Sequence, residues 1–151
     1  MEAVHIRPLV STDLADASAL LVTLNPETPA EVVEKRLHAI LLDHPHYQLF
    51  GAFAGNRLSG VAGAWIATKI WCGRYLEIDN LVVDPDQRSS GVGSRLMAHL
   101  EELARERACT IIVLDSYTSN HASHRLYHRL GFEIWGFHFI KPIGDWKGGA
   151  P

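Results

Sequence analysis

The stretch LVVDPDQRSSGVGSRL, which spans Leu81–Leu96, decides how this chain is expected to fold. Its first residues are apolar and β-branched, as in a strand, and Pro85 ends that strand because proline cannot donate to a neighbouring strand. Apolar residues then recur at helical spacing, with charged residues on the other faces, at Val92, Leu96, Leu100 and Leu103. The stretch therefore predicts a strand, a loop of small residues and the start of a helix.

The loop RSSGVG, residues Arg88–Gly93, has the features of a phosphate-binding turn. The first N–H groups of a helix have no partner within the helix and carry a partial positive charge, so they can hold an anion. The loop lacks both the Gly-Lys-Ser/Thr ending of nucleoside triphosphate loops and the third glycine of the dinucleotide fingerprint. A different phosphate ligand is indicated, although a Gly-x-Gly pair alone is also compatible with a plain tight turn.

Outward from this stretch, periodicity and turn residues predict the remaining elements. Before it we expect a strand at 3–9, helices at about 14–24 and 30–42, and strands at 47–54, 58–69 and 75–83. After it we expect a helix at 91–107, a strand at 109–115, a helix that begins at Ser119 or Asn120 and ends at Gly131, and a last strand at about 133–140. Two short turns make the three strands before the loop an antiparallel meander.

The order strand, helix, strand around the loop predicts a right-handed crossover between two parallel strands. The fold class is therefore α/β with a mixed sheet. Ligands of such sheets bind at the carboxyl ends of the parallel strands, which here means the chain after Val83 and after Asp115.

Composition restricts the classes of protein and partner. The 151 residues suit a single domain, 1–151, with a loosely ordered tail at about 144–151. A net charge of −3 gives no basis for electrostatic binding to nucleic acid. Two cysteines do not make a disulfide framework, and we find neither an apolar run of membrane-spanning length nor a signal peptide. The expected compartment is the cytoplasm.

Three motifs in the right order resemble the GNAT superfamily of acetyl-CoA-dependent N-acetyltransferases. They are Leu81–Pro85 followed by R88-x-x-G91-x-G93, then Asn120, then the segment Tyr127–Phe132. The resemblance is close over about Tyr75–Phe139 and extends to the first 70 residues only in the order of elements. It implies a single-domain GNAT-like fold: a mixed, mostly antiparallel sheet with a splayed parallel pair of central strands, flanked by about four helices.

The resemblance also implies how acetyl-CoA would bind. Main-chain N–H groups of the loop would receive the pyrophosphate. The main chain of Leu81–Val83 would run beside the pantetheine arm, with an N–H near Val83 polarising the thioester carbonyl as an oxyanion hole does. Asn120 matches the pantetheine-binding asparagine and also suits a helix cap. The residues assigned to acetyl-CoA are Leu81, Val82, Val83, Arg88, Ser89, Ser90, Gly91, Val92, Gly93, Ser94 and Asn120. Many members have a basic residue or glycine where Ser89 and Ser90 stand.

The resemblance places the general acid at Tyr127, whose phenol can protonate the departing thiolate, although the same ring would also suit packing against the sheet. The amine needs a base, and Glu77 matches the position used in some members. Asp115 matches the carboxylate used in others, and it would alternatively pair with Arg125. We favour Glu77. Asp79 lies on the same face of the strand by alternation and could orient the substrate.

The histidines of the helix after Asn120 raise the question of a metal site. His124 and His128 are four residues apart and share a face, with His121 one turn earlier. Without a nearby cysteine or acidic ligand, solvated histidines are the preferred interpretation, and no metal is predicted.

The amine acceptor is not legible in the sequence. His44 and His46 flank Pro45 on the expected acceptor side, and Trp65 and Trp71 either line a pocket there or pack in the core and hairpin.

We predict direct transfer of acetyl to a primary amine in a ternary complex, because neither cysteine is placed to form an acyl-enzyme. Cys72 falls in a turn and Cys109 begins a strand. The alternatives are transfer of a longer acyl group and a non-catalytic module that senses acyl-CoA. A homodimer is possible through apolar residues of the last strand, Ile134, Phe137 and Phe139.

Overall fold

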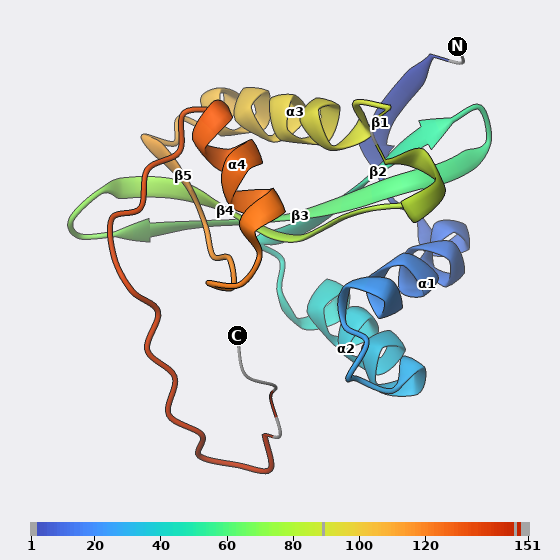
Figure 1. Cartoon of the computed structure of the whole chain (residues 1–151), viewed down its shortest axis with the longest axis horizontal. Helices are drawn as coiled ribbons and strands as arrows, with labels where there is room; N and C mark the ends of the chain where they lie inside the picture. Colours follow the sequence, from blue (N-terminus) through green and yellow to red (C-terminus); the bar gives the residue numbers. More distant parts are fainter. Residues whose placement is uncertain (1–2, 89, 147, 149–151) are drawn as a thin grey trace. The chain divides into compact units, whose positions relative to one another are not determined.

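The computed structural model describes residues 3–88, 90–146 and 148. The chain divides into two compact units, Met1–Leu114 and Asp115–Pro151 (Figure 1). Of the tail expected to be loosely ordered, residues 147 and 149–151 lie outside the described residues. None of the described helices is long and apolar enough to cross a membrane.

The first unit is built on one sheet whose strands follow the order β1-β2-β3-β4-β5. The strands are β1 Val4–Pro8, β2 Tyr47–Ala54, β3 Arg57–Lys69, β4 Gly73–Val83 and β5 Ile111–Leu114. Neighbours from β1 to β4 are antiparallel, whereas β5 is parallel to β4. The predicted meander and the predicted parallel pair are both confirmed, and the class is a mixed, mostly antiparallel α/β sheet.

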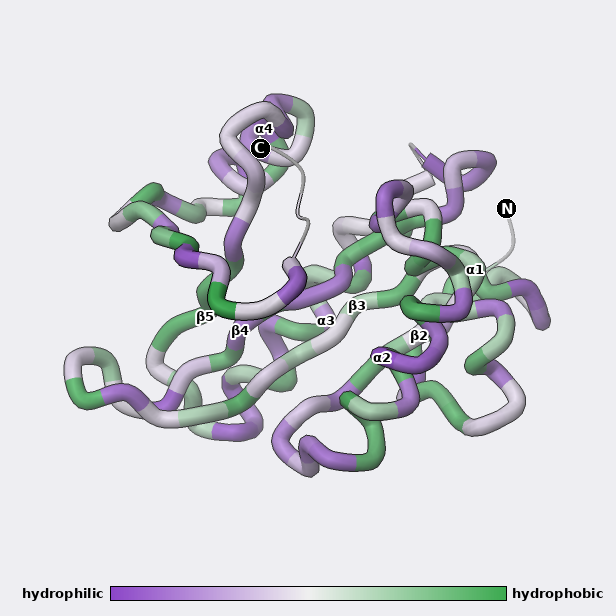
Figure 2. Tube along the Cα trace, turned by 90° about the horizontal axis from the view of Figure 1, so that it is seen from below, coloured by the Kyte–Doolittle hydropathy of each residue, from purple (hydrophilic) through white to green (hydrophobic). Residues whose placement is uncertain are grey.

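Helices cover both faces of this sheet. On one face, α1 (Leu14–Leu24) and α2 (Ala30–Asp43) enclose a hydrophobic core. That core contains Ala17, Leu21, Val33 and Leu37 of the helices and Tyr47, Leu49, Phe53, Val61 and Val82 of the strands. On the other face, α3 (Val92–Glu106) lies so close to β3 that a methyl group at Gly60 would come within 3.0 Å of Val92. Figure 2 shows that α2 carries both hydrophobic and hydrophilic residues, as a helix with one buried face does.

β4 carries one extra residue, and this bulge prepares the functional region. Val61 of β3 is opposite Val82 of β4, but Gly63 is opposite Asp79, so three steps along β4 match two along β3. Inside the bulge, Asn80 has a φ of 55°, in the left-handed region that asparagine tolerates better than most residues.

β4 and β5 separate immediately before this bulge. Their pairing runs from Tyr75 opposite Ile111 to Ile78 opposite Leu114 and then stops. No strand among the described residues pairs with residues 79–83 on the side where β5 began. The predicted splay of the parallel pair is therefore present.

The second unit contains the fourth helix, α4 (His121–Arg129). The side chain of Asn120 caps it by accepting from the N–H of Ser123 at 3.3 Å, and Gly131 with a φ of 90° follows its end. The predicted strand at 133–140 is wrong, because these residues pair with no strand among the described residues. Alternating apolar residues favour a strand, but a strand also needs a ladder partner, which periodicity cannot supply.

Candidate active site

The start of α3 offers main-chain donors that no side chain of the described residues occupies. Gly91 is the N-cap with a φ of 82°, and no side-chain hydrogen bond caps this helix end within the described residues. The first turn carries no acidic residue. Its orphan N–H groups, those of Val92, Gly93 and Ser94, together with the helix dipole, form a site suited to an anion.

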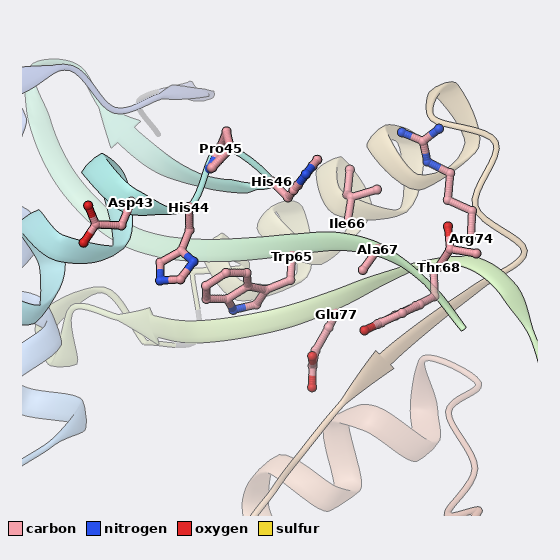
Figure 3. Close-up of a pocket in the computed structure, with 11 residues that line it drawn as sticks. Asp43, His44, Pro45, His46, Trp65, Ile66, Ala67, Thr68, Arg74 and Glu77 are labelled. Atoms are coloured by element: carbon pink, nitrogen blue, oxygen red, sulfur yellow. The ribbon is translucent and has the colours of Figure 1, made fainter. Parts of the chain in front are cut away.

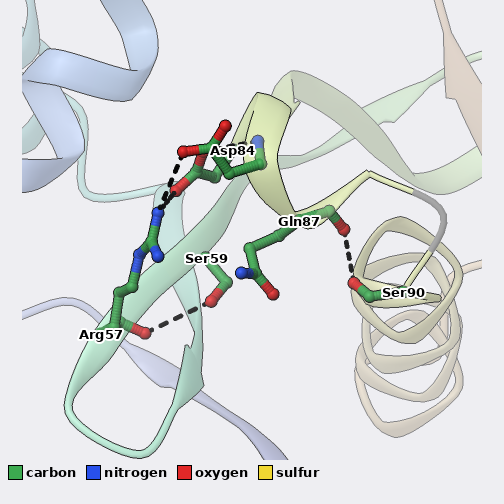
Figure 4. Close-up of polar contacts among 6 residues, drawn as sticks. Arg57, Ser59, Asp84, Gln87 and Ser90 are labelled. Atoms are coloured by element: carbon green, nitrogen blue, oxygen red, sulfur yellow. Dashed lines mark hydrogen bonds and ion pairs between the residues drawn. The ribbon is translucent and has the colours of Figure 1, made fainter.

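The chain that leads into α3 is fixed by contacts of its own (Figure 4). Asp84 accepts from the N–H of Asp86 at 3.0 Å and from Nη2 of Arg57 at 2.6 Å. These two interactions hold the pKa of Asp84 below its usual range, and the main-chain hydrogen bond has the larger effect. The Ser90 hydroxyl donates to the carbonyl of Gln87 at the end of the short 3-10 turn. Ser89, one of the predicted phosphate-loop residues, lies outside the described residues, and Arg88 is exposed.

The main chain of Leu81–Val83 connects the bulge to this loop. It lies beyond the last pair between β4 and β5, so on that side it presents polar groups that no described strand uses. On the other side the strand stays anchored, since the N–H of Asp84 donates to the carbonyl of Ser59 at 2.9 Å. An extended ligand can therefore lie beside Leu81–Val83 and end at the start of α3.

A cavity of about 650 Å³ lies farther back along β3 and β4 (Figure 3). It is lined by Asp43, His44, Pro45, His46, Trp65, Ile66, Ala67, Thr68, Arg74, Tyr75 and Glu77. Trp65 and Glu77 are direct neighbours across the two strands and so share the face that α1 and α2 cover. The cavity thus combines a carboxylate with an aromatic wall, a combination suited to an amine.

The aromatic wall is held by polar contacts behind it. Nε1 of Trp65 donates to Oδ2 of Asp79 at 3.1 Å, and its ring packs on Tyr47 with centroids 4.6 Å apart. The hydroxyl of Tyr47 accepts from Nδ2 of Asn80 at 3.0 Å. Burial raises the pKa of Tyr47, so this hydroxyl stays protonated. Gly63 makes room for the phenol, because a methyl group there would collide with it.

In the second unit, Tyr127 is half-buried on α4. Burial raises the pKa of its hydroxyl, and a hydrogen bond with the Ser123 side chain acts in the opposite direction. Its ring lies 5.9 Å from that of Phe132, measured between centroids. The hydroxyl therefore keeps its proton at neutral pH, as a proton donor must.

The other predicted polar residues of this unit have local partners. Asp115 lies 3.1 Å from Nδ1 of His138, rather than beside Arg125. His124 contacts the carbonyl of Tyr117 through Nε2 at 2.8 Å, and His128 contacts that of Phe132 at 3.2 Å. Within the described residues no three His, Cys, Asp or Glu side chains gather as metal ligands.

Residues 17–132 match the model of the Acetyltransferase (GNAT) family. The chain belongs to the GNAT family. It is 28% identical over 142 residues to the uncharacterized N-acetyltransferase YhdJ of Bacillus subtilis, covering 93% of this chain and 99% of that one. It is also 28% identical over 146 residues to aminoalkylphosphonate N-acetyltransferase of Salmonella typhimurium, covering 95% and 94%.

The fold of the GNAT chain is that of solved acetyltransferases. The structure of aminoglycoside N-acetyltransferase AAC(6′)-Iy in complex with CoA superposes with a TM-score of 0.82 at 23% identity, over 95% of this chain and 96% of the other. The fold inferred from the sequence resemblance is confirmed by this match and by the family match.

The cavity of this GNAT chain also involves residues that the sequence did not single out. Tyr47 and Asn80 support the wall of the cavity, and Tyr75 lines it. An Asp-Asn pair inside an apolar strand was the available signal, because both residue types are rare there and favour irregular backbone. The sequence left open whether the two tryptophans line a pocket or pack in the core and hairpin. Trp65 lines the cavity, whereas Trp71 is 64% exposed and is not among the lining residues.

Proposed function

We propose that this GNAT chain transfers the acetyl group of acetyl-CoA directly to a primary amine in a ternary complex, with residues 1–151 acting as one N-acetyltransferase domain. One observation carries the proposal. A single strand, β4, lines the acidic and aromatic cavity through Glu77 and then continues past its bulge to the start of α3, with one edge of its main chain paired to β3 and the other edge unpaired among the described strands. That order suits an amine and a long diphosphate-bearing carrier on one strand.

Acetyl-CoA binding rests on main-chain groups. The N–H groups from residue 88 to Ser94 would receive the pyrophosphate, as helix starts do for phosphates. Leu81–Val83 would pair with the amide-containing pantetheine arm, and an N–H near Val83 would donate to the thioester carbonyl. Asn120 would hold pantetheine with the part of its amide that its cap leaves free, since only its oxygen is used by Ser123.

The chemistry needs one base and one acid. An amine with a pKa near 10 arrives as an ammonium, and Glu77 would take its proton, directly or through one water. The freed nitrogen attacks the thioester carbon, a C–N bond forms, the C–S bond breaks, and the nitrogen releases its second proton, through water, to the phenolate that Tyr127 leaves. Tyr127 would give its proton to the departing thiolate, so the products are an acetylated amine and coenzyme A thiol. Asp115 remains the alternative base.

The acceptor is sought among amines that fit a cavity with both acidic and basic lining. The name of the Salmonella relative gives a small amine with an anionic group. Arg74 lines the cavity but lies on the opposite face of β4 from Glu77, so no basic partner for that group is assigned. The panel therefore sets aminoalkylphosphonates beside polyamines, amino acids, aminoglycosides and peptides with a free N-terminus.

The test measures thiol release from acetyl-CoA with each amine, with calorimetry of coenzyme A binding alongside. Thiol release with at least one amine, together with intersecting initial-rate lines, supports the proposal. A ping-pong pattern contradicts direct transfer. Binding without thiol release for any amine would indicate an acyl-CoA sensor, and preference for succinyl- or malonyl-CoA would indicate transfer of a longer acyl group.

A further inference from the structure

We infer that Asp79 is a positioning residue that holds the acceptor cavity and the carrier-binding main chain in one arrangement, through Trp65 on one side and Asn80 on the other. The inference rests on the proposed function and concerns how its two substrates are placed relative to each other. Asp79 lies on β4 between Glu77 and the bulge, and its two carboxylate oxygens have different partners.

The first oxygen of Asp79 fixes the wall of the cavity. Oδ2 accepts from Nε1 of Trp65 at 3.1 Å, and an indole has no other polar group by which its rotation can be set. The ring also contacts His44 edge-on at 5.2 Å, but His44 is exposed and belongs to the chain before β2. The carboxylate is therefore the polar contact that aims Trp65 beside Glu77.

The second oxygen fixes the bulge. Oδ1 accepts from the N–H of Asn80 at 2.9 Å, and Asn80 holds a left-handed φ of 55°. This conformation costs energy for a residue other than glycine and takes the N–H away from the regular ladder. The carboxylate satisfies that N–H and so stabilises the kink. Leu81, the first residue assigned to the pantetheine arm, follows the kink directly.

Tyr47 closes the arrangement. Its ring packs on Trp65 at 4.6 Å and its hydroxyl accepts from Asn80 at 3.0 Å, while the side chain is only 5% exposed. Trp65, Asp79, Asn80 and Tyr47 thus form a closed set of contacts that joins β2, β3 and β4. Of these four, Asp79 is bonded both to the cavity wall and to the main chain of the bulge, so its loss should affect both substrates.

The decisive experiment separates the Michaelis constants of the two substrates. Asp79→Ala should raise KM about tenfold for the amine and also about tenfold for acetyl-CoA, since a hydrogen bond to a charged group is worth roughly that factor. Trp65→Phe keeps an aromatic wall but removes the N–H donor, and it should raise KM for the amine while leaving KM for acetyl-CoA within about twofold. Asp79→Asn retains a single acceptor oxygen and should restore one of the two constants.

Controls distinguish positioning from general damage. Asp16→Asn, at an exposed aspartate of α1, should change neither constant, and thermal unfolding should show that the Asp79 variants are folded at the assay temperature. A change in only one constant for Asp79→Ala, or the same change in both constants for Trp65→Phe, would overturn the inference.

Failure of the proposed function would be visible separately. If the wild-type protein releases no thiol with any amine, the coupling is measured by binding alone. Calorimetry should then show weaker coenzyme A binding for Asp79→Ala and unchanged binding for Trp65→Phe, and equal binding of coenzyme A by the wild type and Asp79→Ala would contradict the inference.

Discussion

The two ends of β4 offer two kinds of binding site. Beyond the bulge, Leu81–Val83 and the start of α3 present main-chain groups. Before the bulge, the cavity is built from side chains. Glu77 lies opposite Trp65, and Asp79 holds Trp65 by a hydrogen bond. A site made of main chain depends on backbone conformation, whereas a site made of side chains depends on the identity of each residue.

If acetyl-CoA binds as proposed, this difference would let one fold keep a carrier while its acceptor changes. Substitutions beside Leu81–Val83 and the start of α3, the proposed carrier side, should be tolerated as long as the backbone keeps its path. Substitutions around the cavity alter the shape and charge that the acceptor meets. Variants on the two sides should therefore have different kinetic signatures, and the predictions below run from the largest expected effect to the smallest.

Glu77→Gln is the sharpest test of the cavity side. At pH 7 only about 1 in 10³ molecules of an amine with a pKa near 10 is unprotonated, so loss of the base should lower kcat/KM by about 10³-fold. The deficit should shrink as pH rises toward the pKa of the amine, and the pH–rate profile measures this. Coenzyme A affinity should stay unchanged. A profile that keeps its wild-type shape would transfer the base role to Asp115.

Tyr127→Phe tests the second unit. Removal of the hydroxyl should lower kcat by about 10²-fold, because the thiolate must then take its proton from water. Because burial raises the pKa of Tyr127, the wild-type hydroxyl should remain a donor throughout the neutral range. Calorimetry should report nearly unchanged coenzyme A binding. Full activity in the variant would show that another group is the acid.

Gly91→Ala tests whether the carrier side depends on backbone. There is open space around a methyl group at this position, so packing is not the obstacle, but a φ of 82° is strained for alanine. Strain of about 1–2 kcal/mol should raise KM for acetyl-CoA about tenfold and leave KM for the amine unchanged. Gly136→Ala also meets open space, has no left-handed φ and is the matched control. Equal effects of the two substitutions would contradict the main-chain interpretation.

Arg57→Leu should have the smallest effect, a rise of about twofold in KM for acetyl-CoA, because exposed ion pairs contribute little. The pH dependence of its stability is more informative. The pKa of Asp84 is lowered in the folded protein, so its contribution to stability is present above about pH 4 and is lost as pH falls through the folded value. The difference in melting temperature between wild type and variant should therefore narrow below pH 4. A constant difference would show that Asp84 does not respond to Arg57.

The elements around the start of α3 were predictable from the sequence because their signals are local. Pro85, Gly91 and the apolar spacing of α3 each act within a few residues, and the strands and helices around them were predicted to within about two residues of their observed ends. The strand at Tyr47–Ala54 was predicted with its observed bounds. Local patterns failed at 133–140, where the apolar residues alternate but no described strand pairs with them.

The cavity was only partly predictable, because its geometry depends on register between strands. The family resemblance makes Glu77 a candidate base, but its neighbour Trp65 follows only from the pairing of β3 with β4. The bond between Trp65 and Asp79 joins residues 14 positions apart and requires that same register. The Asp79-Asn80 pair inside an apolar strand indicates irregular backbone, but no sequence pattern indicates that Asn80 contacts Tyr47.

The bulge in β4 also puts the two halves of that strand out of phase. Glu77 and Asp79 point to the α1 and α2 side, and beyond the extra residue it is Val82 that joins the core on that side. Deletion of one residue here would restore the alternation but turn either the carboxylates or the apolar anchor to the opposite face. The bulge is therefore what allows one continuous strand to be both a wall of a polar cavity and part of a dry interior.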